Sequence, residues 1–248
     1  MALSILSNPA ASSAAFSLNK NSAKLQQSLN RLSSGKKITT PADDAGGLAV
    51  SMKLSSAITR NRSVISNIQN ALSFAEVQDG ALTSAATIVN RMAELKSMSM
   101  DVLKSSSDKA NYNVEFQALQ TQLHSIASEA FNGVTLFSSE SSKTFGTHAV
   151  NVTIFTSDLG ANGSTVSLGK ALLVSAVTFT SGTSTTAAAA GASGSKSLAV
   201  ASGGSKVSVG ELGVSFFTKA LENIATLRAT NAAGMARLQL AEDHARLT

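Results

Sequence analysis

With 248 residues, the chain is long enough for one elongated domain or two compact ones. It has no cysteine, which excludes disulfide bonds and cysteine-metal sites, and its net charge of +5 comes from scattered residues without interleaved aromatics, so we predict no nucleic-acid binding. Hydrophobic residues make up 43% of the chain but aromatic ones only 4%, which favours a slender helical bundle. Charged residues reach only 14%, against about 25% in average proteins, so much of the surface is polar or covered by neighbouring molecules.

The first predicted element is an amphipathic helix over residues 1–34 with a loose start. Its apolar residues recur at heptad-like spacing: Leu18, Leu25, Leu29 and Leu32. This run is too short for an autonomous coiled coil. Two interpretations remain open, namely one helix of a bundle or a helix that becomes ordered only in an assembly. Gly35 is suited to end this helix, and residues 36–40 form a connector.

The stretch from Leu48 to Leu103 organises the chain. It contains no proline, and a continuous helix here would be roughly 80 Å long at about 1.5 Å per residue. Pro41 lies near its start, and we interpret Asp43 and Asp44 as capping carboxylates, because a metal site would need more ligands. The predicted apolar stripe consists of Ile58, Ile65, Ile68, Leu72, Ala75, Leu82, Ala85, Val89, Met92 and Leu95.

A third helix is predicted from about Asp108 to Phe131, short enough to fold back antiparallel onto the long helix. Ser107 or Asp108 would cap it, and Asn132-Gly133 would end it with glycine in the left-handed conformation. One face of this helix carries Phe116, Leu119, Leu123, Ile126 and Ala130. His124 is interpreted as structural, because no acid or nucleophile pattern accompanies it.

The character of the sequence changes between residues 134 and 210. Alternation over 150–155 and part of 174–179 predicts short strands, and residues 181–192 form a tract of low complexity. Deleting about 181–204 is therefore expected to leave the helices intact. The helical period returns at Val214 and continues to Thr248, and Gly234 weakens this helix locally. Its apolar residues are Phe217, Leu221, Ile224, Leu227 and Leu238.

These elements predict a mainly α fold, an elongated antiparallel helical bundle or rod with a small β-rich central insertion. A chain of this kind needs partners along its helices, because packing supplies most helical stability. The residues predicted to serve packing and assembly are Leu25, Leu29, Leu32, Ile65, Leu72, Leu82, Leu123, Leu221 and Ile224.

Several long motifs resemble those of bacterial flagellins. They are LNRLSSGKKI at 29–38, PADDAGGLAVS at 41–51, NYN at 111–113 leading to FNGV at 131–134, and ALENIATLRA at 220–229. The resemblance covers residues 1–137 and 212–248. It implies four parts: a helical filament-core segment at 1–40, the N-terminal part of a helical rod domain at 41–137, a variable β-rich, low-complexity insertion at 138–211, and the C-terminal part of the rod at 212–248. Flagellins continue into a further C-terminal helix, so this sequence is expected to be truncated or incomplete.

The resemblance implies a structural subunit that self-assembles into the helical tube of the flagellar filament for motility. It further implies secretion through the flagellar type III channel to an extracellular location, with cap and junction proteins and an export chaperone as partners. A hook–filament junction protein is an alternative, although residues 41–51 favour flagellin. A surface adhesin or binding module is another alternative.

We expect no enzyme, cofactor or metal site, since the sequence lacks a phosphate loop, a paired acid/base constellation and metal-ligand spacing. The first basic residue is Lys20, so the start of the chain is not a secretory signal. No stretch is long and apolar enough for membrane insertion.

The resemblance also implies contact with a host toll-like receptor through a motif at residues 90–96. Arg91, Glu94 and Leu95 keep the residue types of the family. Arg91 and Leu95 are four residues apart and so share one face of a helix. From the residues alone, Leu95 belongs to the core stripe and Arg91 to a solvated or inter-subunit face, whereas the resemblance favours receptor contact by the monomer.

Overall fold

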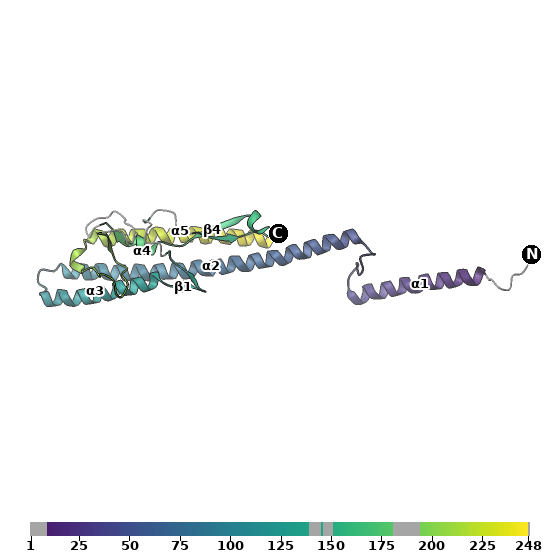
Figure 1. Cartoon of the computed structure of the whole chain (residues 1–248), viewed down its shortest axis with the longest axis horizontal. Helices are drawn as coiled ribbons and strands as arrows, with labels where there is room; N and C mark the ends of the chain where they lie inside the picture. Colours follow the sequence, from purple (N-terminus) through teal and green to yellow (C-terminus); the bar gives the residue numbers. More distant parts are fainter. Residues whose placement is uncertain (1–8, 139–144, 146–150, 181–193, 248) are drawn as a thin grey trace, which may run out of the picture. The chain divides into compact units, whose positions relative to one another are not determined.

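The computed structural model of the chain describes residues 9–138, 145, 151–180 and 194–247. The chain divides into two compact units, Met1–Thr59 and Arg60–Thr248. The predicted mainly α fold is confirmed. The helices are α1 (Pro9–Ser34), α2 (Ala45–Ser99), α3 (Ser106–Ala127), the short α4 (Leu173–Ala176) and α5 (Val214–Leu247), coloured in sequence order in Figure 1.

The first unit contains α1, the connector and the beginning of α2. Gly35 has φ of +64°, the left-handed conformation that glycine adopts without strain, and α1 ends just before it as predicted. Asp44 caps α2, because its carboxylate accepts a hydrogen bond of 2.9 Å from the Gly47 N–H. The predicted capping role therefore holds for Asp44. Asp43 instead accepts hydrogen bonds from Thr39 and Thr40 in the connector between α1 and α2.

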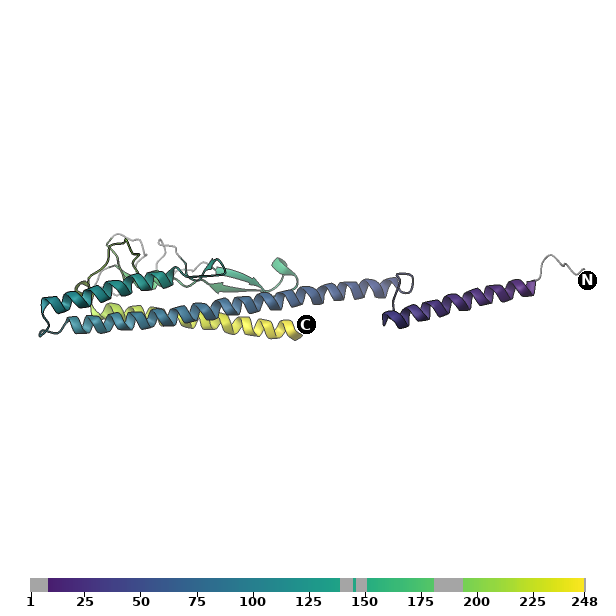
Figure 2. The same ribbon diagram turned by 90° about the horizontal axis from the view of Figure 1, so that it is seen from below.

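The second unit is built on the remainder of α2, with α3 and α5 alongside it and both running in the opposite direction (Figures 1 and 2). The pairing of α2 with α5 follows from hydrogen bonds along their length: the Gln69 amide donates to Glu242 at 2.9 Å, and the Asn61 amide donates to the Ala245 carbonyl at 2.8 Å. The long predicted helix is present, but it ends at Ser99 rather than at Leu103.

The predicted stripe of α2 forms most of the inner side of the core. The members from Ile68 onward are fully buried except Leu72, which packs against the core half-buried, as Ile65 does. Ile58, the first member of the apolar stripe, is 47% exposed and lies outside the core of the second unit. It precedes Arg60, where the second unit begins.

The ends of α3 differ from the prediction. Its N-cap is Ser105, not Ser107 or Asp108: the Ser105 hydroxyl accepts from the Asp108 N–H at 3.2 Å, and the Asp108 carboxylate accepts from the Ser105 N–H at 3.0 Å. This reciprocal capping box needs the acid three residues after the cap, which places the start of the helix at Ser106.

The helix ends at Ala127, and Asn132-Gly133 does not terminate it. These two residues instead turn a hairpin of β1 (Ala130–Phe131) and β2 (Val134–Thr135), with φ of +49° and +78°. Two consecutive positive φ values are the requirement of a two-residue hairpin turn, for which Asn-Gly is a preferred pair. Ala130 therefore lies in a strand and not on the face of α3.

The middle of the chain contains short antiparallel pairs. The predicted strand near 150–155 is present as β3 (Asn151–Phe155), which pairs with β4 (Thr165–Gly169). The short strand predicted in part of 174–179 is present as β5 (Thr178–Phe179), which pairs with β6 (Lys196–Ser197), whereas α4 occupies residues 173–176. Two short 3-10 helices complete the described part, Gly160–Asn162 and Val209–Glu211.

Gly234 allows α5 to approach this β structure closely. A Cβ atom at Gly234 would lie 2.8 Å from Leu168 Cδ1 on β4. Glycine in a helix interior costs about 1 kcal/mol relative to alanine. The close packing of α5 against β4 explains why this position lacks a side chain.

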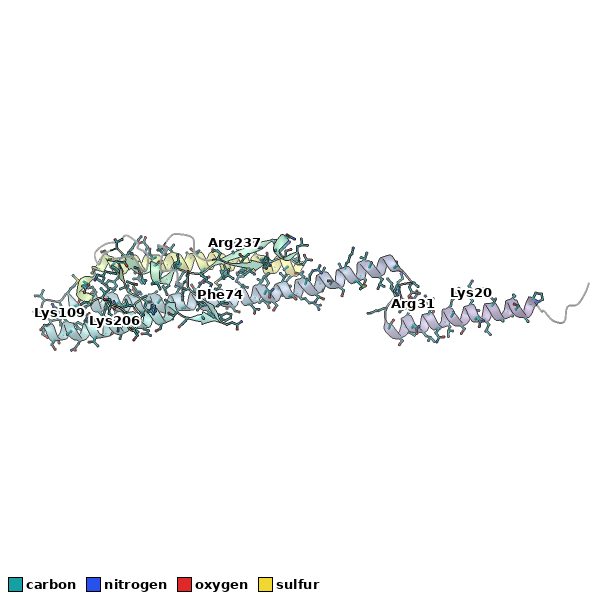
Figure 3. All side chains as sticks on the ribbon, in the orientation of Figure 1. Lys20, Arg31, Phe74, Lys109, Lys206 and Arg237 are labelled. Carbon is teal, nitrogen blue, oxygen red and sulfur yellow. The ribbon has the colours of Figure 1, made fainter. Side chains whose placement is uncertain are left out.

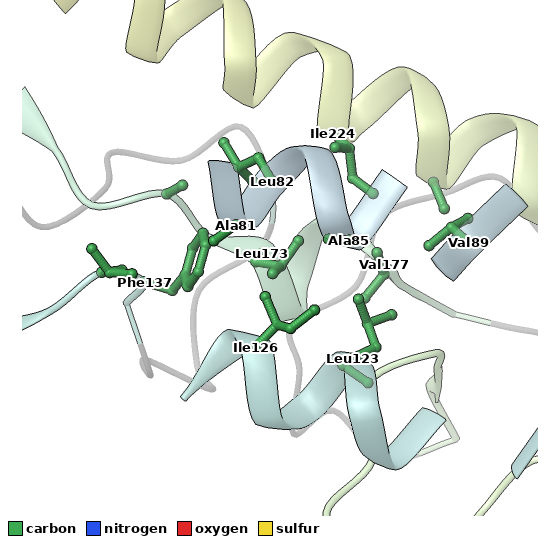
Figure 4. Packing of buried hydrophobic residues seen from close by; sticks show 14 of the residues in the cluster. Ala81, Leu82, Ala85, Val89, Leu123, Ile126, Phe137, Leu173, Val177 and Ile224 are labelled. Carbon is green, nitrogen blue, oxygen red and sulfur yellow. The ribbon is translucent and has the colours of Figure 1, made fainter. Parts of the chain in front are cut away.

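The middle contributes to the same hydrophobic core as the long helices. Leu173, Val177 and Phe179 are fully buried, and Figure 4 shows Leu173 and Val177 between side chains of α2, α3 and α5. Leu198, which follows β6, is also 0% exposed. Deleting residues 181–204 would remove this core residue and the paired strand β6, so the expectation that the helices stay intact remains a prediction. The tract 181–192 itself lies outside the described residues.

Candidate functional site

The leucine stripe of α1, defined as Leu18, Leu25, Leu29 and Leu32, is open to solvent. Its members are 71%, 65%, 54% and 81% exposed, in that order. Across its described length α1 contains no buried residue. Packing within its own unit therefore stabilises α1 little. The exposed leucine stripe is a candidate surface for association with other molecules.

The other residues predicted for packing lie in the second unit. Leu82, Leu123 and Ile224 are buried at its centre. Ile65, Leu72 and Leu221 are half-buried and pack against the same core. The predicted set thus separates into an exposed group on α1 and a group that holds the helices of the second unit together.

Asp43 organises the connector between α1 and α2. One oxygen of its carboxylate accepts hydrogen bonds from the Thr39 N–H at 3.1 Å, the Thr39 hydroxyl at 3.0 Å and the Thr40 N–H at 3.1 Å. The other accepts from the Arg31 guanidinium at 3.1 Å and from the Gln27 amide. The two backbone N–H donors, followed by the Thr39 hydroxyl, hold the pKa of Asp43 well below its usual range. Asp43 therefore ties the end of α1 to the connector.

We expect Asp43→Asn to loosen this connector, because asparagine has one acceptor oxygen and no charge. Amide hydrogen exchange at Thr39 and Thr40 should become faster once intrinsic rates are divided out. Acidification should have a similar effect on the wild type: a carboxyl whose pKa is depressed by folding stabilises above its unfolded pKa of about 3.9, and the contribution is lost as pH falls through the lower folded value.

The matched control is Asp44→Asn, since asparagine also caps helices and Asp44 makes no bond to Thr39 or Thr40 in the described contacts. Exchange at these two amides should then stay at the wild-type level. Unchanged protection in Asp43→Asn would contradict the assigned role.

Arg91 lies at the centre of an exposed ionic cluster on α2 and α3. Its Nε donates to Glu115 at 2.8 Å and its Nη1 donates to Glu94 at 3.0 Å. These two carboxylates, Glu115 first, raise the pKa of Arg91. The Arg91 and Glu94 side chains are 45% and 63% exposed. Sequence reasoning missed Glu115, because a contact between two helices leaves no local signal in either.

Leu95 does not share this accessible surface. It is 0% exposed and belongs to the core. Leu95 lies one helical turn after Arg91, but its side chain points into the core, whereas the Arg91 side chain is exposed. In this fold a partner that approaches the surface reaches Arg91 and Glu94, whereas Leu95 supports them from below.

A cavity of about 570 Å³ lies between α5, β4 and α2 in the second unit. Gln78 and Asn231 line it, and both are at least nine-tenths buried. Their amide N–H groups donate to the backbone carbonyls of Leu136 and Ala75, at 2.6 and 2.7 Å, which fixes the orientation of both amides. Their amide oxygens have no hydrogen-bond partner in the described part of the chain. Such a buried unsatisfied acceptor costs about 1–3 kcal/mol.

Within the described ranges, no group of three or more His, Asp or Glu side chains is placed to hold a metal ion. The helices described by the structure include none with the length and apolar character needed to cross a membrane.

Comparison with known proteins places the chain in a family. A model of the family described as the bacterial flagellin N-terminal helical region matches residues 5–142. A flagellin of Listeria innocua is 31% identical over 222 residues, which are 89% of this chain and 73% of that protein. The flagellar filament 33 kDa core protein of Treponema phagedenis is 31% identical over 156 residues, or 62% of this chain and 54% of that protein.

The crystal structure of Bacillus cereus flagellin has the same fold, with a TM-score of 0.52 at 20% sequence identity, covering 73% of this chain and 88% of that one. The chain belongs to the bacterial flagellin family. It spans about half the length of the first curated relatives that it matches, for example 47% of the flagellar filament 31.3 kDa core protein of Treponema maltophilum.

Proposed function

We propose that this chain is a structural subunit of the bacterial flagellar filament, which assembles through exposed helix faces into a helical tube. The observation that carries the proposal is the exposed leucine stripe of α1, in a chain whose family consists of filament proteins. Amphipathic helices that meet different surfaces of their neighbours give a heterologous contact, and such contacts extend without closing. The relatives described above are named as flagellins or filament core proteins, which favours this function over a junction protein or an adhesin.

The proposal includes an extracellular location and export through the flagellar type III channel. Cap protein, junction proteins and an export chaperone are the further partners that it implies. The low charge of the chain supports an assembled state, because a surface of Ser, Thr, Asn and Gln can be covered by neighbouring subunits at a smaller desolvation cost than a charged one.

We expect Leu29→Asp to prevent polymerisation while it preserves the helix content of the subunit. Leu29 is exposed in the single chain, so aspartate there leaves the core untouched. At an interface, however, the substitution removes about 1.5–3 kcal/mol of apolar burial and adds a charge. The critical concentration should rise by at least about tenfold. Sedimentation and electron microscopy of the purified protein measure this.

Ala23→Asp provides a matched control, because Ala23 is exposed and its helical position lies on the side of α1 away from the leucine stripe. It introduces the same side chain into the same helix and should leave the critical concentration near that of the wild type. Wild-type protein that stays monodisperse at all concentrations, or equal assembly by Leu29→Asp, would contradict the proposal.

We also propose that a host toll-like receptor recognises the monomer at Arg91 and Glu94. Both side chains are accessible, and arginine is enriched among the anchors of protein interfaces. The ion pair with Glu115 holds the Arg91 guanidinium in one place, which lowers the entropy lost on binding. Leu95 serves this proposal only as support beneath the surface.

Arg91→Ala is expected to weaken binding to the receptor ectodomain by at least about 1 kcal/mol. Surface plasmon resonance with monomeric protein gives the affinity. Arg62→Ala is the control, since Arg62 is another exposed arginine of α2 and should bind like the wild type. Equal affinities for wild type and Arg91→Ala, or no binding by either, would reject the receptor site without affecting the filament proposal.

A further inference from the structure

The first unit, residues 1–59, carries most of the net positive charge of the chain. Six basic and two acidic side chains leave it a net charge of +4, out of +5 for the whole chain. Both acidic side chains are occupied, since Asp43 accepts hydrogen bonds from Arg31 and from two threonines of the connector, and Asp44 caps α2. The other five basic side chains are exposed and make no hydrogen bond or ion pair within the part of the chain that the structure describes: Lys20, Lys24, Lys36, Lys37 and Lys53.

The helix α1 separates its cations from its leucines. Lys20, Lys24 and Arg31 are four and seven residues apart, so they fall within about 40° of one another around the helix at about 100° per residue. Figure 3 labels Lys20 and Arg31 on this helix. The leucine stripe is similarly narrow, about 60° wide, and its centre lies about 130° from that of the cations. No Asp or Glu occurs in α1. A basic amphipathic helix of this kind is typical of proteins that lie on a membrane surface.

A membrane surface that contains anionic lipids fits both sides of this helix. The leucines of such a helix enter the boundary between headgroups and acyl chains, to a depth of about 5–10 Å. The lipid phosphates lie above that boundary, so cations on the flank of the helix are at their level, and lysine reaches them on a flexible stem. An acidic protein would neutralise the lysines, but it would also need a groove matched to the leucines, whereas a lipid surface adapts to them.

We propose that α1 of the monomeric protein binds the surface of anionic lipid membranes. The leucine stripe faces the lipid, and the unpaired lysines of the first unit contact the headgroup phosphates. The helix lies in the plane of the surface and does not cross the bilayer. In a filament the same stripe is covered by neighbouring subunits, so membrane binding is a property of the monomer.

The test measures binding of the full chain to sucrose-loaded vesicles by sedimentation. One set of vesicles contains phosphatidylcholine alone, and the other contains equal parts of phosphatidylcholine and phosphatidylglycerol. The protein is kept below the concentration at which it polymerises. Because each lysine near an anionic surface strengthens binding by about fivefold, the anionic vesicles should bind at least about tenfold more tightly than the neutral ones. Raising the salt from about 0.1 M to about 1 M should remove most of this difference.

Hydrogen exchange locates the contact within the chain. Anionic vesicles should slow exchange of the backbone amides of α1 between Leu18 and Leu32. The amides of α3 belong to the second unit, and their exchange should not change. Protection of α3 without protection of α1 would overturn the proposal.

Exposed positions allow the charge and the apolar contact to be removed separately. Lys20→Gln combined with Lys24→Gln should weaken binding to anionic vesicles by at least about tenfold. Leu25→Gln should weaken it by about fivefold or more, because less apolar surface leaves water. Lys104→Gln combined with Lys206→Gln is the matched control, since it removes the same charge from the second unit. This double variant should bind like the wild type.

Weaker binding by both α1 variants, with the control near the wild type, supports the proposal. It is overturned if anionic vesicles bind no better than neutral ones, if Leu25→Gln binds like the wild type, or if the control pair loses as much affinity as the α1 pair. Polyglutamate that protects α1 as strongly as the vesicles do would indicate an acidic protein partner and would also overturn it. None of these results would affect the filament proposal, because assembly is measured without lipid.

Discussion

Leu82→Asp is expected to unfold most of the second unit at room temperature. Leu82 belongs to α2, and its side chain is 0% exposed in the core formed with the elements packed on this helix (Figure 4). Loss of the leucine side chain alone costs about 2–5 kcal/mol. A buried carboxyl without a partner adds several kcal/mol more. Since domains of this size have a free energy of unfolding of only about 5–15 kcal/mol, the variant should lose cooperative unfolding in urea as followed by circular dichroism.

Val77→Asp is the matched control on the same helix, because Val77 is 43% exposed. The free energy of unfolding should change by no more than about 0.5 kcal/mol there. Leu72→Asp should fall between the two, since Leu72 is half-buried at the edge of the core. If Leu82→Asp and Val77→Asp unfolded at the same urea concentration, the helix packing described above would be wrong.

Phe179→Ala should destabilise the second unit by about 3–5 kcal/mol, although Phe179 lies in the middle of the chain and outside the long helices. The Phe179 and Phe216 rings meet edge to face with their centroids 4.4 Å apart, and both side chains are 0% exposed. Alanine at either position leaves a cavity between β5 and α5. Urea unfolding of the single and double variants should show a coupling of about 0.5–1.5 kcal/mol for the ring pair.

Phe155→Ala controls for the loss of a phenylalanine from the same region, because Phe155 is 43% exposed on β3. Its effect should be clearly smaller than that of Phe179→Ala. Equal effects of the two substitutions would show that the middle of the chain is not part of the core, and would restore the interpretation of this region as a dispensable insertion.

Local patterns in the sequence were sufficient to predict where the long helices lie. The apolar residues of α2 and α5 recur at helical spacing, and this periodicity persists over many turns, so errors at single positions do not change the assignment. Gly35 and Asp44 were predictable for a similar reason, since a left-handed glycine and a capping carboxylate act within a few residues of the helix end.

Short motifs were less informative, because the same residues serve more than one structure. Asn132-Gly133 suits a helix end and a hairpin turn equally well, and only the pairing of β1 with β2 selects the turn. Residues 174–176 alternate like a strand but form a helical turn, because their neighbours in the core and not their own propensity decide the conformation.

The candidate sites depended most on the tertiary structure. The sequence by itself determined the family motifs, the helices, the composition and the presence of Arg91, Glu94 and Leu95 within a few residues. Only packing decided that Leu95 is buried while Arg91 is accessible, and only the approach of α3 placed Glu115 beside Arg91. The cavity with Asn231 likewise joins residues far apart in the chain. The physical reason is that burial and pairing are relations between elements, whereas a sequence pattern reports on one element at a time.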